Sequence, residues 1–256
     1  MANKLKLLDL FSGIGGFSLG LERTGGFETV AFCEYDEKAQ LVLKKHWPDV
    51  PIFKDVRDMN YEGSIDVISG GYPCQPFSSA GKRQGEEDER HLWPPMFDLV
   101  KKHRPSWVIG ENVDGHISMG LDQVLDDLEG QGYSTRTFII PAGSVGAVHK
   151  RSRLWVVANS GGKRWYGLDY DKKERCSGVS PPVMGERCFH NENLLSLFME
   201  WDASNPSSGR CRNDDGLSEG VDRLRQLGNA VVPQIPEIIG NAILAVMKKN
   251  EESLNG

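Results

Sequence analysis

One cysteine in this 256-residue sequence stands in a setting that favours nucleophilic chemistry. Cys74 lies in the loop 70–78 (GGYPCQPFS), directly after an apolar segment that we expect to be a strand. A free thiol is only a few per cent ionised at neutral pH, so a nucleophilic cysteine needs electropositive surroundings. Pro73 and Pro76 stiffen the loop on either side of the thiol. A lone cysteine is more often a small buried residue, but this loop favours a nucleophile.

A glycine-rich turn, residues 9–17 (DLFSGIGGF), is typical of a site that binds a nucleoside-containing cofactor. Glycines between a strand and a helix let a ligand approach the backbone and leave helix N–H groups free. The spacing is G-x-G-G, because Ser18 stands where a dinucleotide fingerprint has its third glycine. Glu34 ends the next apolar segment, where a carboxylate can bind ribose hydroxyls, and Asp55 follows a further strand end. A plain tight turn is the alternative.

The elements that position these residues alternate short apolar strands with helical stretches over the first 158 residues, which indicates an α/β fold with a mostly parallel sheet. The expected strands cover residues 5–10, 29–33, 65–69, 106–110, 134–140 and 154–158. The expected helices lie near residues 15–23, 36–46, 93–103, 119–130 and 236–249. Ligands of such folds sit at the carboxyl ends of the strands.

From residue 159 the composition changes, and residues 159–222 are rich in Gly, Ser, Asn, Asp and charged residues with scattered aromatics. This texture predicts a small irregular lobe, and a disordered insert is the alternative. We therefore predict two regions, a main domain of residues 1–158 plus 223–256 and a separate region of residues 159–222.

The bulk composition, 39% hydrophobic and 26% charged, predicts an ordinary globular protein with no membrane span. No signal-peptide pattern opens the sequence, so we expect the cytoplasm. The net charge of −6 argues against non-specific coating of nucleic acid, although residues 141–230 carry 13 Lys+Arg against 11 Asp+Glu. The five cysteines are widely spaced with no C-x-x-C pair, so we predict no metal site. A metal site formed by the three cysteines within residues 176–211 is the alternative.

Five motifs, in order, resemble the DNA cytosine-5 methyltransferase family of prokaryotic or phage type. They are the glycine turn, the PCQP loop at 73–76, the ENV tripeptide at 111–113, the RSR segment at 151–153 and the closing QLGNAVVP at 226–233. The resemblance covers residues 5–158 and 223–247. One position departs from the family, because His149 stands where a glutamine usually precedes the first arginine; we expect it to support the arginine strand.

The resemblance implies transfer of a methyl group from S-adenosylmethionine to C5 of a flipped-out cytosine in specific double-stranded DNA sequences. Cys74 would add to C6 as a thiolate, which makes C5 nucleophilic. Glu111 would protonate or hydrogen-bond N3 of the base. Arg151 and Arg153 would contact the base and orient Glu111 and Cys74, and strand alternation would place both arginines on one face. The base is stacked in the duplex, so the enzyme must extrude it.

The same reading assigns residues to each ligand. Those expected to bind S-adenosylmethionine are Asp9, Phe11, Gly13, Gly15, Gly16, Glu34, Asp55, Val56, Pro73, Asn229 and Val231. Those expected to bind DNA are Gln75, Ser78, Arg90, Lys163, Arg164, Arg210 and Arg212. Residues 78–95 would be a loop that closes over the base, with an ordinary solvated loop as the alternative. Residues 159–222 would be the target-recognition region, which reads base edges in the major groove.

Three other readings stay open on the sequence. The same fold methylates cytosine in tRNA in some relatives, and other relatives bind DNA without catalysis. A nicotinamide oxidoreductase would explain the glycine turn and Glu34, but it leaves the cysteine loop and the closing motif without a purpose. In the favoured reading the protein is a monomer, acts in restriction-modification or phage DNA protection, and has a separately acting restriction endonuclease as a partner.

Overall fold

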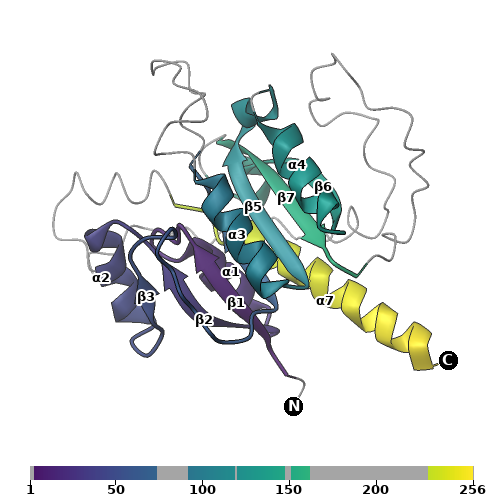
Figure 1. The fold of residues 1–256 in the computed structure, drawn as a ribbon, viewed down its shortest axis with the longest axis horizontal. Helices are drawn as coiled ribbons and strands as arrows, with labels where there is room; N and C mark the ends of the chain where they lie inside the picture. The colour runs from purple at the N-terminus through teal and green to yellow at the C-terminus, as the bar shows by residue number, and fades with distance from the viewer. Residues whose placement is uncertain (1–2, 74–91, 119, 148–150, 162–229, 256) are drawn as a thin grey trace.

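The computed structural model of the chain describes residues 3–73, 92–118, 120–147, 151–161 and 230–255 (Figure 1). Within them, seven strands form one sheet in the order β3-β2-β1-β4-β5-β7-β6. The strands are β1 (Leu5–Leu10), β2 (Phe27–Cys33), β3 (Ile52–Phe53), β4 (Val67–Gly70), β5 (Trp107–Val113), β6 (Ser134–Pro141) and β7 (Ser152–Asn159). The neighbours from β3 to β5 are parallel, and β7 is antiparallel to both β5 and β6. The predicted mostly parallel α/β sheet is confirmed.

The helices of the described residues cover the two faces of this sheet. They are α1 (Gly16–Arg23), α2 (Glu37–His46), α3 (Trp93–His103), α4 (Leu121–Gly130) and α7 (Gln234–Asn255), with short 3-10 turns η2 (Asp114–Ser118) and η3 (Ala142–Val145). The start of α2 is fixed by Asp36, whose carboxylate accepts hydrogen bonds from the backbone N–H groups of Lys38 and Ala39. No helix in the described ranges is long and apolar enough to cross a lipid bilayer.

Alternation along the strands divides the core into two apolar clusters, one on each side of the sheet. On one side Leu8 of β1 packs in a cluster with Met96 of α3 and Leu128 of α4. On the other side Leu7 packs in a cluster with Ile239 of α7, and α1 joins the same cluster. In Figure 1 the long α7 lies behind the strands, opposite α3 in front. A rigid, two-sided core therefore holds the strand ends in place.

The register aligns one residue from each of four strands in a single row. Leu10 of β1 pairs with Cys33 of β2 on one side and with Gly70 of β4 on the other, and Gly70 pairs with Gly110 of β5. Each of these four residues directly precedes a segment in which the sequence predicts function. Parallel pairing thus places the glycine turn, Glu34, the cysteine loop and Glu111 at the same edge of the sheet.

The antiparallel strand β7 reaches this edge from the opposite direction. Its residue Arg153 pairs with Val113, and Trp155 pairs with Glu111. This pairing extends β5 three residues beyond the predicted end at residue 110, so Glu111 lies within the strand rather than after it. Arg151 lies just before β7 begins at Ser152, so strand alternation applies to Arg153 alone, and the shared face of the two arginines stays a prediction.

Most expected elements are present with small shifts at their ends. The helix expected at 236–249 is longer, because it runs from Gln234 to Asn255. Strand β3 is the further strand whose end the sequence placed before Asp55; its bounds were not predicted, since two residues are too few to show any apolar alternation. The structure describes only residues 159–161 of the predicted target-recognition region, so the predicted boundary at residue 222 lies outside the described residues.

Candidate active site

The glycine turn after β1 has left-handed backbone conformations at three positions. The φ angles are +51° at Phe11, +54° at Gly13 and +87° at Gly15. Ser12 closes the turn, because its hydroxyl donates to the Asp9 carbonyl oxygen at 2.6 Å and its own carbonyl accepts from Gly15 N at 2.9 Å. A positive φ is uncommon for phenylalanine and often marks a functional segment. Nothing lies within 4 Å of the point where a Cβ on Gly13 would stand, which leaves open space beside its Cα.

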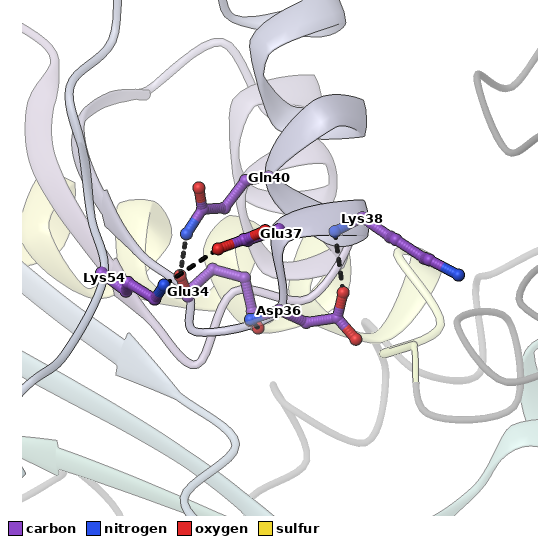
Figure 2. A network of polar contacts seen from close by, with 6 residues as sticks. All are labelled: Glu34, Asp36, Glu37, Lys38, Gln40 and Lys54. Carbon is purple, nitrogen blue, oxygen red and sulfur yellow. Dashed lines mark hydrogen bonds and ion pairs between the residues drawn. The ribbon is translucent and has the colours of Figure 1, made fainter.

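Glu34 ties this turn to the end of β2. Its Oε2 accepts a hydrogen bond from Gly13 N at 2.7 Å, and its Oε1 accepts one from Asp36 N at 2.8 Å. Gln40 of α2 donates to the Glu34 carbonyl oxygen at 2.6 Å (Figure 2). Burial raises the pKa of Glu34, and the backbone donors oppose that rise. The carboxylate is therefore already oriented by two amides, beside the turn whose backbone a cofactor would approach.

Asp9 lies beneath the turn and is fully buried. Its Oδ2 accepts from the hydroxyl of Ser18 and its Oδ1 from the hydroxyl of Ser69, each at 2.8 Å. Burial raises the pKa of Asp9 to about 7, although these donors lower it. The side chain links β1 to α1 and β4 rather than facing solvent. The structure therefore places Asp9 where it can act on a cofactor only by holding the turn.

The C-terminal segment returns to the glycine turn, as the sequence predicts. A Cβ on Gly16 would lie 2.5 Å from the Val231 carbonyl oxygen, so the close approach requires glycine. Helix α7 then continues along α1 with residues such as Ile235 in the core (Figure 1). Val231 thus stands beside the turn, whereas Asn229 lies outside the described residues. Binding of the cofactor by Val231 stays a prediction.

The rim of this site contains one aromatic residue that the sequence analysis missed. Tyr35, directly after Glu34, is 67% exposed. The ammonium of Lys54 lies 5.6 Å from the centre of the Tyr35 ring. The same ammonium lies 2.9 Å from Glu37 Oε1 (Figure 2). An exposed ring next to the carboxylate that we predict to bind ribose offers a stacking surface for a base. The signal that could have found it is an aromatic residue directly after the acidic strand end.

Asp55 and Val56, which the sequence predicts to contact the cofactor, both have other partners within the protein. The Asp55 carboxylate holds the guanidinium of Arg57, with Nε at 2.9 Å and Nη2 at 2.6 Å, and this pairing lowers the pKa of Asp55. The Val56 side chain is 5% exposed and packs in the core. Their predicted contacts with the cofactor are untested.

On the other side of the row, the end of β5 and the start of β7 bring an acid and a base together. Arg153 Nε lies 3.0 Å from Glu111 Oε1, and the two side chains are 23% and 12% exposed. A Cβ on Gly71 would lie 3.2 Å from Glu111 Oε2. The Glu111 carboxylate therefore lies between a guanidinium and the backbone of the loop that leads to Cys74.

The environment of Glu111 adjusts its proton affinity in the direction that the predicted chemistry needs. Burial raises the pKa of Glu111, and this effect exceeds the opposing influence of Arg153 and Arg151. The carboxyl group can therefore retain a proton, or share one with a bound base, closer to neutral pH than an exposed glutamate can. Burial also lowers the pKa of Arg151, but a guanidinium stays charged at any pH of interest.

We call the ends of β1 and β2 the glycine-turn half of the site, and Glu111, Arg151, Arg153 and the loop 71–73 the glutamate half. Pro73 is the last described residue before the cysteine. Several predicted residues lie outside the described residues: Cys74, Gln75, Ser78, Arg90, His149, Lys163, Arg164, Arg210, Arg212 and Asn229. Among the residues that the structure does describe, no group of three or more His, Cys, Asp or Glu side chains could hold a metal ion.

A parallel sheet with one antiparallel strand, a glycine turn after β1 and an acid at the end of β2 defines the methyltransferase class of α/β fold. The profile described as C-5 cytosine-specific DNA methylase matches residues 5–187. The type II methyltransferase M.NgoMIV of Neisseria gonorrhoeae is 36% identical, over 94% of this chain and 98% of its own length. This chain belongs to the C-5 cytosine-specific DNA methylase family.

Other relatives match over a smaller share of their length. The type II methyltransferase M.HgiBI of Herpetosiphon aurantiacus is 36% identical over 60% of this chain and 37% of its own length. The chain spans less than half the length of several such relatives.

Two solved structures share the fold. A proposed DNA modification methyltransferase from an E. coli prophage superposes with a TM-score of 0.53 and 29% identity, over 61% of this chain and 47% of that one. DNMT2 of Spodoptera frugiperda gives 0.56 at 22% identity, over 66% and 54% respectively, a likeness of fold alone.

Proposed function

We propose that this chain transfers a methyl group from S-adenosylmethionine to C5 of cytosine in specific double-stranded DNA sequences. One observation carries the proposal: the buried Glu111 carboxylate, bound to Arg153, lies against the Gly71 backbone three residues before Cys74. A nucleophile loop, an acid of raised pKa and a guanidinium are the groups that addition to a pyrimidine ring needs. All three come from neighbouring strands of one sheet.

The glycine-turn half fits the cofactor. The open space at Gly13 leaves room for a methionine moiety, and the carboxylate of Glu34 and the exposed ring of Tyr35 offer partners for a ribose and a base respectively. When bound, S-adenosylmethionine supplies an electrophilic methyl group on a sulfonium. Cofactor contacts by Pro73 and by the segment around Val231 belong to the same proposal.

In the proposed reaction, the thiolate of Cys74 adds to C6 of the extruded cytosine. Glu111 protonates or hydrogen-bonds N3, which accepts the electron density that the addition pushes into the ring. The ring is then an enamine whose C5 would take the methyl group as the S–CH3 bond breaks, with the neutral thioether S-adenosylhomocysteine as the leaving group. Loss of the proton from C5 lets the C–S bond break, which restores the double bond and frees Cys74. Arg153 keeps Glu111 oriented, and the positive charge of Arg151 and Arg153 favours the thiolate.

The relatives named as type II methyltransferases support a role in restriction-modification or in the protection of phage DNA. Residues 159–222 would then read the target sequence, with Lys163, Arg164, Arg210 and Arg212 among the DNA contacts. A cognate endonuclease would act as a separate protein, and this chain would work as a monomer on DNA in the cytoplasm of a prokaryotic cell.

Covalent trapping tests the proposal. The wild-type chain, incubated with labelled S-adenosylmethionine, should methylate duplex DNA rather than tRNA and should form a stable adduct with a duplex that carries 5-fluorocytosine. Cys74→Ser should abolish both. Cys33→Ala is the matched control, because the Cys33 thiol is buried and its pKa is raised to about 12 by that burial. Full transfer by Cys74→Ser would overturn the mechanism, and methylation of tRNA alone would move the substrate to RNA.

A further inference from the structure

Tyr72, two residues before Cys74, is held at three points. Its ring is 3% exposed and packs against Trp93, with the ring centres 5.1 Å apart. Its hydroxyl lies 3.1 Å from Nε2 of His116, which is 4% exposed. Its carbonyl oxygen accepts a hydrogen bond from the side-chain amide of Asn112 at 3.0 Å. The residue that delivers the cysteine loop is therefore fixed in ring, hydroxyl and backbone.

The surrounding chain makes room for this arrangement. A Cβ on Gly110 would lie 3.2 Å from Tyr72 Cε1, so the ring lies closely over the end of β5. Trp93, the first residue of α3, donates from its indole nitrogen to Asp127 Oδ2 of α4 at 2.8 Å. His116 belongs to the 3-10 turn that directly follows β5. The contacts of Tyr72 thus join four separate segments beneath the candidate active site.

Two consecutive residues of β5 hold the approach to the cysteine from different sides. Asn112 binds the Tyr72 carbonyl, while the carboxylate of Glu111 lies against Gly71. Successive side chains of a strand point to opposite faces, so one residue can fix the loop while the next performs chemistry. Any rotation of Tyr72 would change the distance between this loop and Glu111.

The hydroxyl of Tyr72 and the ring of His116 need a reason beyond packing. A phenylalanine at position 72 would fill nearly the same volume, and burial of a hydroxyl beside an imidazole costs desolvation that their mutual hydrogen bond only offsets. What this bond adds is directional geometry. We propose that Tyr72 and His116 are a positioning pair, which fixes the loop leading to Cys74 relative to Glu111; this inference rests on the proposed methyl transfer.

The test compares Tyr72→Phe with Tyr133→Phe. Both substitutions remove one buried tyrosine hydroxyl, and the Tyr133 hydroxyl donates to the Pro105 carbonyl at 2.7 Å, at the opposite edge of the sheet. A displacement of about 1 Å can cost a reaction about a hundredfold. We expect Tyr72→Phe to lower the single-turnover rate of methyl transfer at least about tenfold, with the KM for S-adenosylmethionine within about twofold of wild type. Tyr133→Phe should lower only the melting temperature.

The rate at which iodoacetamide alkylates Cys74, measured by mass spectrometry, reports the position of the loop in the absence of DNA. Drift of the loop away from the arginines should slow alkylation in Tyr72→Phe, because the thiolate fraction falls. The double variant Tyr72→Phe/His116→Phe should be alkylated no more slowly than the slower of the two single variants. The reason is that both single substitutions remove the same hydrogen bond. Wild-type rates of transfer and alkylation in Tyr72→Phe would overturn the inference. If the wild type methylates nothing while Tyr72→Phe still alters alkylation, the proposed function fails and the positioning pair stands.

Discussion

The two halves of the site both contain carboxyl groups that are partly or fully buried, but different partners stabilise them. In the glycine-turn half, Asp9 is bound by two serine hydroxyls and Glu34 by two backbone amides. In the glutamate half, Glu111 is paired with the guanidinium of Arg153. Neutral donors on strands and turns are fixed by the fold, so they preserve a shape. A charged neighbour such as a guanidinium changes the pKa of the carboxyl group, which suits a residue that takes part in the reaction.

The difference also separates what each half contributes. The glycine-turn half is held by hydrogen bonds among its own backbone and side chains, which fix the shape of the turn. The glutamate half combines a carboxyl of raised pKa with an approach loop held at Tyr72. Substitutions in the first half should therefore change affinity and stability, and substitutions in the second should change the rate of the chemical step.

Glu111→Gln should give the largest effect and is the sharpest test of that separation. Glutamine keeps the shape but cannot donate a proton to the base, so we expect a fall in single-turnover rate of about a hundredfold or more. The KM for S-adenosylmethionine should change little. Because burial raises the pKa of Glu111, the wild-type rate should fall as pH rises through that raised value, and Glu111→Gln should lack this limb.

Glu28→Gln is the matched control for Glu111→Gln, since Glu28 is an exposed residue of β2. It should leave the rate and its pH profile unchanged. A Glu111→Gln enzyme with the wild-type rate would remove the functional contrast between the two halves.

Asp9→Asn should show that the glycine-turn half contributes to the free energy of unfolding rather than to the rate of the chemical step. The pKa of Asp9 rises from its ordinary value of 3.8 to about 7, and at about 1.4 kcal/mol per pKa unit this corresponds to about 4 kcal/mol. The folded state holds the proton more tightly, so this contribution is complete below pH 3.8 and is lost as pH rises through about 7.

Urea unfolding at pH 5 and pH 8 measures this contribution. The free energy of unfolding of the wild type, relative to Asp9→Asn, should be lower at pH 8 than at pH 5. The exposed Asp49→Asn should follow the wild type at both values. If the free energy of unfolding of the wild type, relative to Asp9→Asn, instead grew with pH, Asp9 would be stabilised as a carboxylate. The two halves of the site would then differ less in how they treat their carboxyl groups.

Glu34→Gln should affect the cofactor and leave the chemical step intact. Hydrogen bonds to a charged carboxylate contribute about 1.5–3 kcal/mol, so loss of the charge should raise the Kd for S-adenosylmethionine about tenfold. Calorimetry of cofactor binding, together with the single-turnover rate at saturating cofactor, separates the two quantities. A large fall in the saturated rate, with Kd unchanged, would show that the glycine-turn half also takes part in the reaction.

The sequence predicts the positions of these groups along the chain but not their pairings. The strands that contain Leu10, Cys33, Gly70 and Gly110 follow from apolar patterns, and the alignment of these four residues in one row follows from parallel pairing. The contact between Glu111 and Arg153 depends instead on the antiparallel register of β7, which involves residues about 40 positions apart and has no local signature.

Other features of the site arise only from the folded geometry. The bond between Tyr72 and His116 joins residues 44 positions apart, and its partners become neighbours only because the turn after β5 folds beside the loop that follows β4. The left-handed backbone of Phe11 is likewise invisible in the sequence, since phenylalanine gives no signal for a positive φ. Local patterns thus specify the strand ends, whereas long-range packing decides which side chains meet there.

The smallest effect is expected at the rim of the glycine-turn half, where Lys54→Met removes the ammonium beside the ring of Tyr35. Lys54 and Glu37 are both exposed, so solvent and salt screen their pairing and its contribution is small. We expect the KM for S-adenosylmethionine to rise less than about twofold and the effect to vanish at high salt. Glu37→Gln should give the same small change, whereas Tyr35→Ala should give a larger one, because the aromatic surface itself is removed. A tenfold rise in KM for Lys54→Met, with no such rise for Glu37→Gln, would contradict this expectation. It would mean that the exposed charge of Lys54 contributes to cofactor affinity, in addition to the backbone amides that orient Glu34.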